Sequence, residues 1–313
     1  MSLSMHIAAL FPDPRVQRAK KQTGIARKTA IVPDPPHEVR QHYAVFERWH
    51  SGFPIFSITQ MVFGDSQSAE AQEYDPNAPA LDELTPQQTA KRAVLYIPGG
   101  DFSDYMPTAA WRFVTDLVDA GLRVDLPLSG RLPDYTAREA VPLVRRAYQD
   151  LLKEHGAENI TIIADGSGAA LALGSLLAFL PDACPSNVIL ADPWYDLVAS
   201  GWQQEHTGKV ASYLKEVSHR WAGGQLNNAK VNPGVMGRQE WRQWAGSTFH
   251  VFVGGHSQPM RDARRLEKDL KNAEVAVEVT RVEGTVYMYH LHRTSEGRRD
   301  RRQMIRIAQG QGN

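Results

Sequence analysis

The chain has 313 residues, of which 42% are hydrophobic, and its 35 basic and 35 acidic side chains cancel to a formal charge of zero. This length and hydrophobic share are enough for one large domain, or for a core domain with a cap. The balanced charge gives no support for a nucleic-acid partner or a membrane-surface partner. The only cysteine, Cys184, has no second cysteine to pair with, which fits a reducing compartment, so we expect a cytoplasmic protein.

The N-terminal part of the chain is polar and contains several prolines. Residues 1–50 predict short helices and loops that form an N-terminal cap segment, without the pattern of a signal peptide. Residues 52–63 are apolar and partly alternating, which predicts one or two antiparallel strands. Residues 64–88 are acidic and rich in Ser, Ala and Pro, so they predict a surface excursion. The longest apolar stretch, residues 169–180, is too short to span a membrane.

From Ala93 onward, short apolar segments alternate with amphipathic ones. Strands are predicted at 93–97, 122–128, 160–164, 187–191, 248–253 and 275–282, and helices near 109–120, 136–155, 167–180, 259–272 and 294–309. Such alternation predicts a mostly parallel sheet with helices on both faces. Residues 197–246 are irregular and contain several tryptophans, so we predict a cap insertion there, and a core formed by 51–196 and 247–313.

The segment 160–173 is the most informative part of the sequence. An apolar strand enters a turn of small residues, and the turn opens directly into an Ala- and Leu-rich helix, which is the layout of a nucleophile elbow. Centring the turn on Gly166 places the small residues Ala164 and Gly168 at its flanks. Glycine at the apex carries no nucleophile and relieves the backbone strain of such a turn. Ser167 is then the first helical residue, with its N–H directed toward an oxyanion position.

Five segments, in order, carry motifs of one enzyme family. They are residues 96–102 (YIPGGDF), 164–168 (ADGSG), 191–197 (ADPWYDL), 253–257 (VGGHS) and 284–289 (GTVYMY). They resemble the oxyanion loop, the elbow, the loop after the next strand, the acid loop and the histidine loop of the hormone-sensitive-lipase-like group of α/β-hydrolases, which are carboxylesterases with a helical cap. The resemblance covers roughly residues 90–292 and implies an α/β-hydrolase fold.

The resemblance also implies that the catalytic positions are replaced. The family's serine, aspartate and histidine fall on Gly166, His256 and Tyr287. A phenol has a pKa near 10, far from the value near 7 that suits a general base, so we interpret Tyr287 as an aromatic wall of a former pocket. His256 has two interpretations: a base recruited to a new role, or a hydrogen-bonding partner of Tyr287.

The neighbouring positions of the motifs predict the rest of the site. Gly99 and Gly100 of the oxyanion loop can present N–H groups to an anion. Asp101 would oppose a developing oxyanion if it pointed inward, and it can equally point to solvent. Asp165 aligns with an elbow residue of the family and is interpreted as structural. Asp192 and Asp196 are predicted to cap or pin the turn after their strand.

Other polar residues predict no further site. His290 and His292 form a single HxH pair without a third metal ligand nearby in sequence, so we interpret them as ordinary polar residues and expect no metal. No dinucleotide fingerprint is present, and no cofactor is expected. The Arg-rich stretch 298–302 is interpreted as the solvated face of a terminal helix.

The leading functional hypothesis is a protein that has lost serine-hydrolase chemistry and binds a small, partly apolar or ester-like ligand or a partner protein, as a monomer or a homodimer. The resemblance supports this idea, because the family includes a plant hormone receptor that binds its ligand without hydrolysing it. Two alternatives remain open. One is an active carboxylic ester hydrolase that uses Ser167 with a rearranged base such as His256. The other is a non-catalytic scaffold whose pocket is filled by its own side chains.

Overall fold

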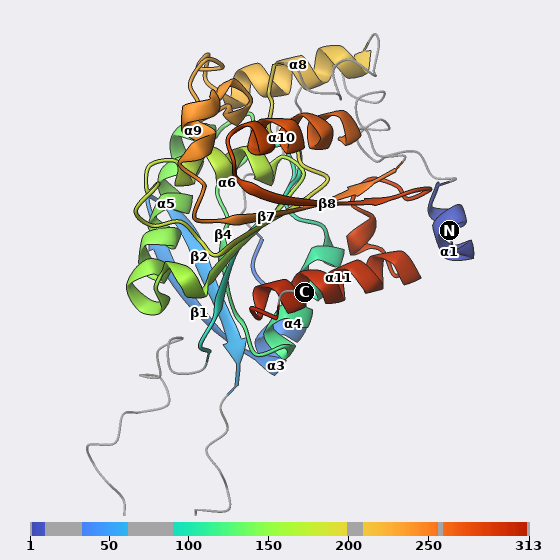
Figure 1. Cartoon of the computed structure of the whole chain (residues 1–313). Coiled ribbons are helices and arrows are strands. Elements are labelled where there is room, and N and C mark those ends of the chain that lie inside the picture. The colour runs from blue at the N-terminus through green and yellow to red at the C-terminus, as the bar shows by residue number, and fades with distance from the viewer. Residues whose placement is uncertain (1, 10–32, 62–89, 199–208, 256–258, 312–313) are drawn as a thin grey trace, which may run out of the picture.

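The structure is a computed structural model, and it describes residues 2–9, 33–61, 90–198, 209–255 and 259–311. Its centre is an eight-stranded sheet in the order β1-β2-β4-β3-β5-β6-β7-β8 (Figure 1). The strands are β1 (Tyr43–His50), β2 (Phe53–Gln60), β3 (Ala93–Ile97), β4 (Arg123–Pro127), β5 (Ile160–Asp165), β6 (Asn187–Ala191), β7 (Thr248–Gly254) and β8 (Ala276–Val282). Strand β2 is antiparallel to both its neighbours, and all other pairs are parallel.

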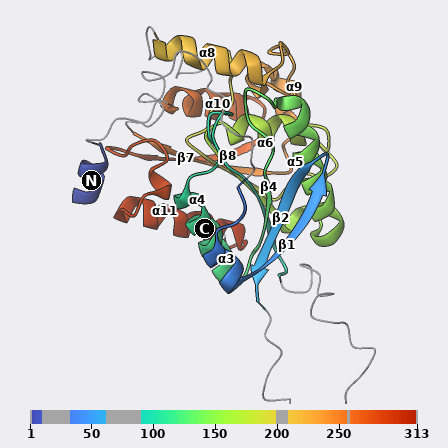
Figure 2. The ribbon, with the colours of Figure 1, turned by 180° about the vertical axis from the view of Figure 1, so that it is seen from behind.

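Helices cover both faces of this sheet (Figures 1 and 2). One face carries α5 (Ala137–His155), α6 (Gly168–Leu176), α8 (Lys209–Trp221), α9 (Arg238–Arg242) and α10 (Met260–Asn272). The other face carries α3 (His37–His42), α4 (Thr108–Asp119) and α11 (Ser295–Ala308). The remaining elements are α1 (Leu3–Ala9) and the 3-10 turns η3 (Ala157–Asn159), η4 (Pro233–Val235) and η5 (Tyr289–Leu291). The predicted mostly parallel sheet between two helical layers is confirmed.

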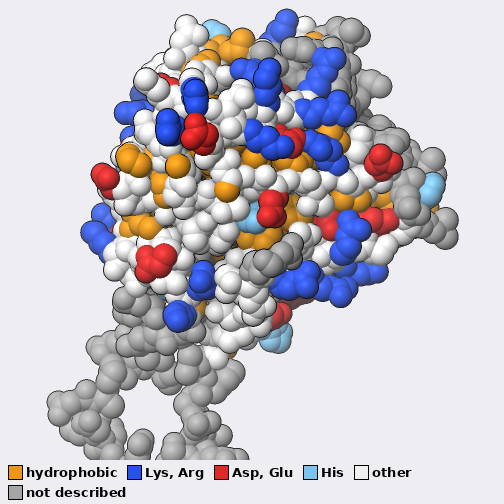
Figure 3. All heavy atoms as spheres, viewed as in Figure 1, with side chains coloured by type: hydrophobic (Ala, Val, Ile, Leu, Met, Phe, Trp, Pro, Cys, Tyr) orange, Lys and Arg blue, Asp and Glu red, His pale blue; other side chains and the backbone are white. Residues whose placement is uncertain are grey.

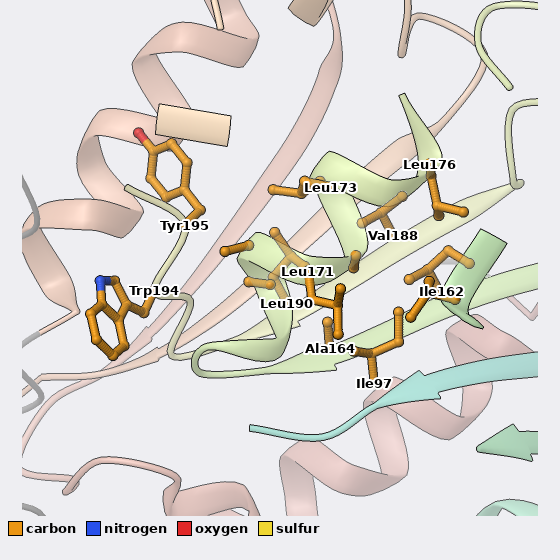
Figure 4. Close-up of a cluster of buried hydrophobic side chains, with 14 of the residues drawn as sticks. Ile97, Ile162, Ala164, Leu171, Leu173, Leu176, Val188, Leu190, Trp194 and Tyr195 are labelled. Carbon is orange, nitrogen blue, oxygen red and sulfur yellow. The ribbon is translucent and has the colours of Figure 1, made fainter. Parts of the chain in front are cut away.

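Each face of the sheet has its own hydrophobic core, because successive side chains of a strand point to opposite faces. In β3, Leu95 and Ile97 pack with α5 and α6, whereas Val94 and Tyr96 pack with α4. Figure 4 shows the first core, where apolar side chains of α6 lie against those of β3, β5 and β6. Burial on both faces explains why these strands are continuous apolar runs in the sequence.

Local signals in the sequence set the ends of the long helix α5. Thr136 and Glu139 form a capping box at its start, in which the Glu139 carboxylate accepts the Thr136 N–H and the Thr136 hydroxyl oxygen accepts the Arg138 N–H. Gly156 follows its last residue with a φ of 73°, a conformation that favours glycine. The helix carries the chain back across the sheet and delivers it to β5 and the elbow.

Two predictions differ from the structure, at the N-terminal segment and at the end of the helix after the elbow. Residues 43–50, predicted within the N-terminal cap segment, form the edge strand β1, which pairs along its whole length with β2. The prediction of one or two antiparallel strands in residues 52–63 is met by the single strand β2. The helix after the elbow ends at Leu176, not near 180. The N-terminal strand was missed because its polar and charged residues hide the alternation, and its side chains are only half-buried.

The region 197–246, predicted as a cap insertion, contains α8, η4 and α9. Its tryptophans Trp221, Trp241 and Trp244 are buried and belong to the same hydrophobic core as α5 and α6. Trp202 lies outside the described residues. The division of the chain into core and cap remains a prediction. Among the described helices, none has the length and apolar character needed to cross a membrane.

Candidate functional site

The turn between β5 and α6 has the geometry of an elbow. Strand β5 ends at Asp165, and Gly166 follows at the apex with a φ of 47°. Ser167 has helical angles, φ −67° and ψ −19°, and precedes the first residue of α6, Gly168. The structure therefore places Gly166 at the apex and Ser167 at the start of the helix, as the spacing of small residues predicts.

The elbow packs so closely against the oxyanion loop that side chains are excluded at two positions. A Cβ atom added to Gly99 would lie 2.8 Å from the carbonyl oxygen of Asp165. A Cβ atom added to Gly168 would overlap the carbonyl oxygen of Ile97, the last residue of β3. Both obstacles are backbone atoms of neighbouring strands, which cannot move without shifting the sheet. These two glycines hold the loop, the elbow and the start of α6 in contact.

At the apex itself, the obstacle is a side chain. A Cβ atom on Gly166 would overlap the phenolic oxygen of Tyr287. The structure thus brings together the positions that resemble the family's serine and histidine, and it fills the space of a nucleophile with the Tyr287 hydroxyl. His256, at the position of the family's aspartate, lies outside the described residues, so its predicted contact with Tyr287 remains a prediction.

Asp192 fixes the loop that carries Tyr287. Its carboxylate accepts the backbone N–H of Gly254 at 3.0 Å, at the end of β7, and also the N–H of Met288. Asp192 and Met288 both have positive φ angles, 45° and 56°. Asp196 accepts the N–H of Val198 at 2.9 Å. The prediction that these two aspartates pin or cap the chain is confirmed, and Asp192 also sets the position of Tyr287.

A fully buried polar group lies on the other side of the elbow. The Asp165 carboxylate accepts a hydrogen bond from the Tyr96 hydroxyl and lies 3.1 Å from Nε2 of His290, and all three residues have 0% exposure. Burial raises the pKa of Tyr96 well above its ordinary value, and the negative charge of Asp165 raises it further. The tyrosine therefore remains a donor. Asp165 is a structural acceptor of the elbow, as its place in the motif implies.

The interpretation of His290 as an ordinary polar residue was wrong. His290 is buried between Tyr289 and Leu291, which are themselves buried, and its ring bonds to Asp165. Its Nδ1 atom has no partner among the described residues. The signal available in the sequence was the pair of apolar neighbours on either side, since a histidine between them is placed in a core and needs a polar partner there.

The solvated interpretation of residues 298–302 also needs correction at two positions, Asp300 and Arg301, which are both buried. Arg301 is only 7% exposed, and its guanidinium donates to the carbonyl oxygens of His290 and His292 and to Asp116. It anchors α11 to the segment after Tyr287.

Burial lowers the pKa of His292, and the nearby His290 lowers it further. Within the ranges that the structure describes, no cluster of three His, Cys, Asp or Glu side chains could hold a metal ion.

A cavity of about 580 Å³ lies beside the elbow. Its wall comes from three places: the oxyanion loop with the residues after it, the first turns of α4, and residues 287–293. Of the site residues predicted from the sequence, Gly99, Gly100, Asp101 and Tyr287 line it. Asp165 and Ser167 do not line it and are buried, with 0% and 2% exposure.

The oxyanion loop reaches this cavity through a tight turn. Gly100 has a φ of 137°, and Asp101 and Phe102 follow with φ angles of 51° and 60°. The carbonyl oxygen of Gly100 accepts the N–H groups of Ser103 at 3.1 Å and Asp104 at 2.7 Å. Asp101 is 2% exposed and belongs to the cavity wall, so its side chain does not point to solvent. A carboxylate at this point opposes an oxyanion.

Several solved structures of esterases and lipases are similar to this chain in fold. An esterase from the bacterial hormone-sensitive lipase family has a TM-score of 0.66, with 17% identity and coverage of 96% of this chain and 99% of that one. The carboxyl esterase 2 of Tuber melanosporum has a TM-score of 0.68 with 12% identity, covering 95% and 98% of the two chains. A hormone-sensitive lipase from a metagenome library has a TM-score of 0.67 with 17% identity, covering 98% and 96%.

The chain has the α/β-hydrolase fold. Among curated proteins, it is 25% identical over 174 residues to a triacylglycerol lipase of Mycobacterium tuberculosis, covering 53% of this chain and 36% of that protein. It is 32% identical over 123 residues to an esterase of Acinetobacter venetianus, covering 37% and 40%. The chain therefore spans well under half the length of these curated relatives in the matched segments. No family model matches the sequence. In this α/β-hydrolase fold, the turn between β5 and α6 carries glycine at its apex and packs against the loop after β3.

Proposed function

We propose that this protein binds a small, partly apolar ligand in the cavity beside the elbow and does not hydrolyse esters there. The observation that carries the proposal is the contact between the elbow apex and the histidine-loop position. Gly166 offers no oxygen to attack a carbonyl, and the Tyr287 hydroxyl occupies the space that a serine side chain would need. Two of the three catalytic positions are therefore unable to form a serine–base pair.

The expected loss of turnover rate supports this proposal. Removing one member of a serine-hydrolase triad lowers the turnover rate by about 10⁴-fold or more, and the residual rate depends on the oxyanion hole. In this protein Asp101 follows the two glycines of the predicted oxyanion loop, and a buried carboxylate there disfavours negative charge on a substrate oxygen. The remaining features of the site are a cavity with largely apolar walls and an elbow whose serine, Ser167, is buried away from that cavity. These are features of a binding site.

The alternative is an ester hydrolase that uses Ser167. The names of the similar proteins, a lipase and several esterases, favour it. The geometry opposes it, because Ser167 has helical angles, is 2% exposed and does not line the cavity. The scaffold alternative, with a pocket filled by side chains, conflicts with a cavity of about 580 Å³.

The proposal is tested by assaying hydrolysis of p-nitrophenyl acetate, butyrate and octanoate by the wild type, Ser167→Ala and Ser175→Ala. Ser175 is the matched control, since it is a buried serine of the same helix α6, two turns from the elbow. We expect no turnover that depends on Ser167, and a saturable rise in melting temperature with at least one small amphiphile. Turnover that disappears in Ser167→Ala but persists in Ser175→Ala would establish the hydrolase instead.

A further inference from the structure

The cavity beside the elbow has charged side chains on its wall that come from different elements. Asp101 and Asp104 lie in the loop after β3, Arg112 lies on α4, and Arg293 follows η5. Tyr105, Pro107, Met288 and Leu291 supply much of the apolar surface. A ligand that fills the cavity therefore meets an apolar wall with carboxylates from one segment and guanidiniums from two others.

The two kinds of charge differ in whether they are already compensated. Asp101 and Asp104 each have an interaction partner. Among the described residues, neither Arg112 nor Arg293 makes an ion pair or a side-chain hydrogen bond, and Arg112 is half-buried. The uncompensated charges on the cavity wall are thus positive. Lys and Arg side chains also gather over α10 and α11 on the surface, but there they mix with acidic groups (Figure 3).

A third arginine, Arg131, packs against the ring of Tyr105, a residue of the cavity wall. Arg131 is only 7% exposed, and its guanidinium carbon lies 5.4 Å from the ring centre of Tyr105, which lines the cavity. Within the described part of the chain it has no carboxylate partner, and its Nε atom makes no hydrogen bond. Burial lowers the pKa of Arg131 to about 10, so the group is still charged at neutral pH. A buried charge without a counter-ion is costly, and an anion placed nearby would offset that cost.

The Tyr105 ring lines the cavity, whereas its hydroxyl oxygen is buried beneath the wall. Its hydroxyl is a buried atom with no hydrogen-bond partner among the described residues. Burial raises the pKa of Tyr105 more than the charge of Arg131 lowers it, so the phenol stays protonated. The donors that the cavity wall offers to a ligand are therefore the guanidinium N–H groups of Arg112 and Arg293, which pair with oxyanions such as a carboxylate, and the apolar remainder of the wall favours an anion that carries an apolar body.

We propose that the ligand of this cavity is a small apolar carboxylate, with its carboxylate toward Arg112 and Arg293 and its apolar body against Tyr105, Met288 and Leu291. The inference rests on the proposed ligand-binding function and names the ligand class. The orientation follows from charge, because the unpaired guanidiniums of Arg112 and Arg293 attract a carboxylate to their part of the wall. A free acid is also the chemical product of ester hydrolysis, so this site would retain the product class without carrying out the reaction.

The test is calorimetric titration of the full chain with octanoate, octanamide and octylamine, which share an apolar body and differ in charge. Wild type is compared with Arg112→Gln, Arg293→Gln and the control Arg302→Gln. Arg302 is an exposed arginine of α11 that does not line the cavity. We expect octanoate to bind wild type about tenfold more tightly than octanamide, and each cavity variant to lose most of that preference, because a charge-assisted hydrogen bond contributes on this scale. Arg302→Gln should bind as the wild type does.

The outcomes separate this inference from the proposed function. If octanamide or octylamine binds as tightly as octanoate, or if both cavity variants keep the full preference for octanoate, the ligand class is overturned and the binding function stands. If no compound binds, the ligand class is overturned too. Turnover of p-nitrophenyl octanoate that depends on Ser167 would instead overturn the non-hydrolytic function. Arg293 is exposed, so its variant remains informative if Arg112→Gln does not fold.

Discussion

The two sides of the elbow are built differently. On the buried side, Asp165 binds Tyr96 and His290 in a group with no solvent exposure, and Gly168 packs directly on the backbone of β3. On the cavity side, the apex has no side chain, and the phenol end of the Tyr287 side chain meets it. The comparison teaches that the packing of an α/β-hydrolase elbow does not depend on its nucleophile, because the close approaches are made by glycines and backbone atoms.

The largest difference between the two sides is expected from adding one methyl group to each. Gly168→Ala places a Cβ atom against the backbone of Ile97 and should lower the free energy of unfolding by about 3 kcal/mol or more. Gly166→Ala meets only the end of the Tyr287 side chain and should lower it by about 1–2 kcal/mol, mainly for the positive φ. Urea denaturation measures both. Equal losses would show that the two sides are packed alike.

The next effect concerns the buried polar group. Asp165→Ala removes the acceptor of Tyr96 and His290 and leaves both polar groups buried, which should lower the free energy of unfolding by about 2–3 kcal/mol. Asp119→Ala is the control, because its carboxylate also accepts from a tyrosine, Tyr43, but at the surface. That change should stay within about 0.5 kcal/mol. Similar losses for the two variants would mean that the buried polar group contributes no more to the free energy of unfolding than the surface pair.

These contrasts also show which parts of the site the sequence could predict. The register of the elbow was predictable, because Ala164, Gly166 and Gly168 are the only small residues whose spacing allows strand and helix to approach. The strands β3, β5 and β6 were predictable as apolar runs. The contact of His290 with Asp165 was not, because 125 positions separate them and no local period links them. The edge strand β1 was missed because half-buried strands lack the apolar pattern.

Tyr287 and Gly166 should be coupled in stability. Gly166→Ser places a side chain where the Tyr287 hydroxyl lies, and Tyr287→Phe removes that hydroxyl. The double variant should therefore be more stable than the sum of the two single changes predicts, by about 1 kcal/mol. A double-mutant cycle from chemical denaturation gives this number. Strict additivity would place the two side chains apart and contradict the filled apex.

The smallest expected effect is a dependence of stability on pH at the cavity wall. Burial and the neighbouring His290 lower the pKa of His292 below its ordinary value of 6.5, so the unfolded chain binds protons more readily there. The contribution is complete above pH 6.5 and is lost as pH falls from that value toward the lower pKa of the folded state. His155 and His250 shift in the same direction, so part of the slope does not depend on His292.

His292→Asn should accordingly make the free energy of unfolding less steep between about pH 7 and pH 5, measured by urea denaturation at several pH values. The carboxyl groups with lowered pKa, among them Glu139 and Glu267, change the stability mainly below pH 4.5, their ordinary pKa. They therefore contribute little to the slope of stability between about pH 7 and pH 5. A slope that is unchanged or steeper in the variant would mean that His292 is not disfavoured as a cation in the folded protein.

The most direct test of the account is labelling of the folded protein with a fluorophosphonate probe, followed by mass spectrometry to locate any adduct. An active serine hydrolase in the same reaction shows that the probe is competent. We expect no adduct on any residue of this chain, because Gly166 carries no oxygen and Ser167 is buried at the start of α6. A stoichiometric adduct on Ser167, absent after Ser167→Ala, would contradict the account and identify the protein as a working serine hydrolase.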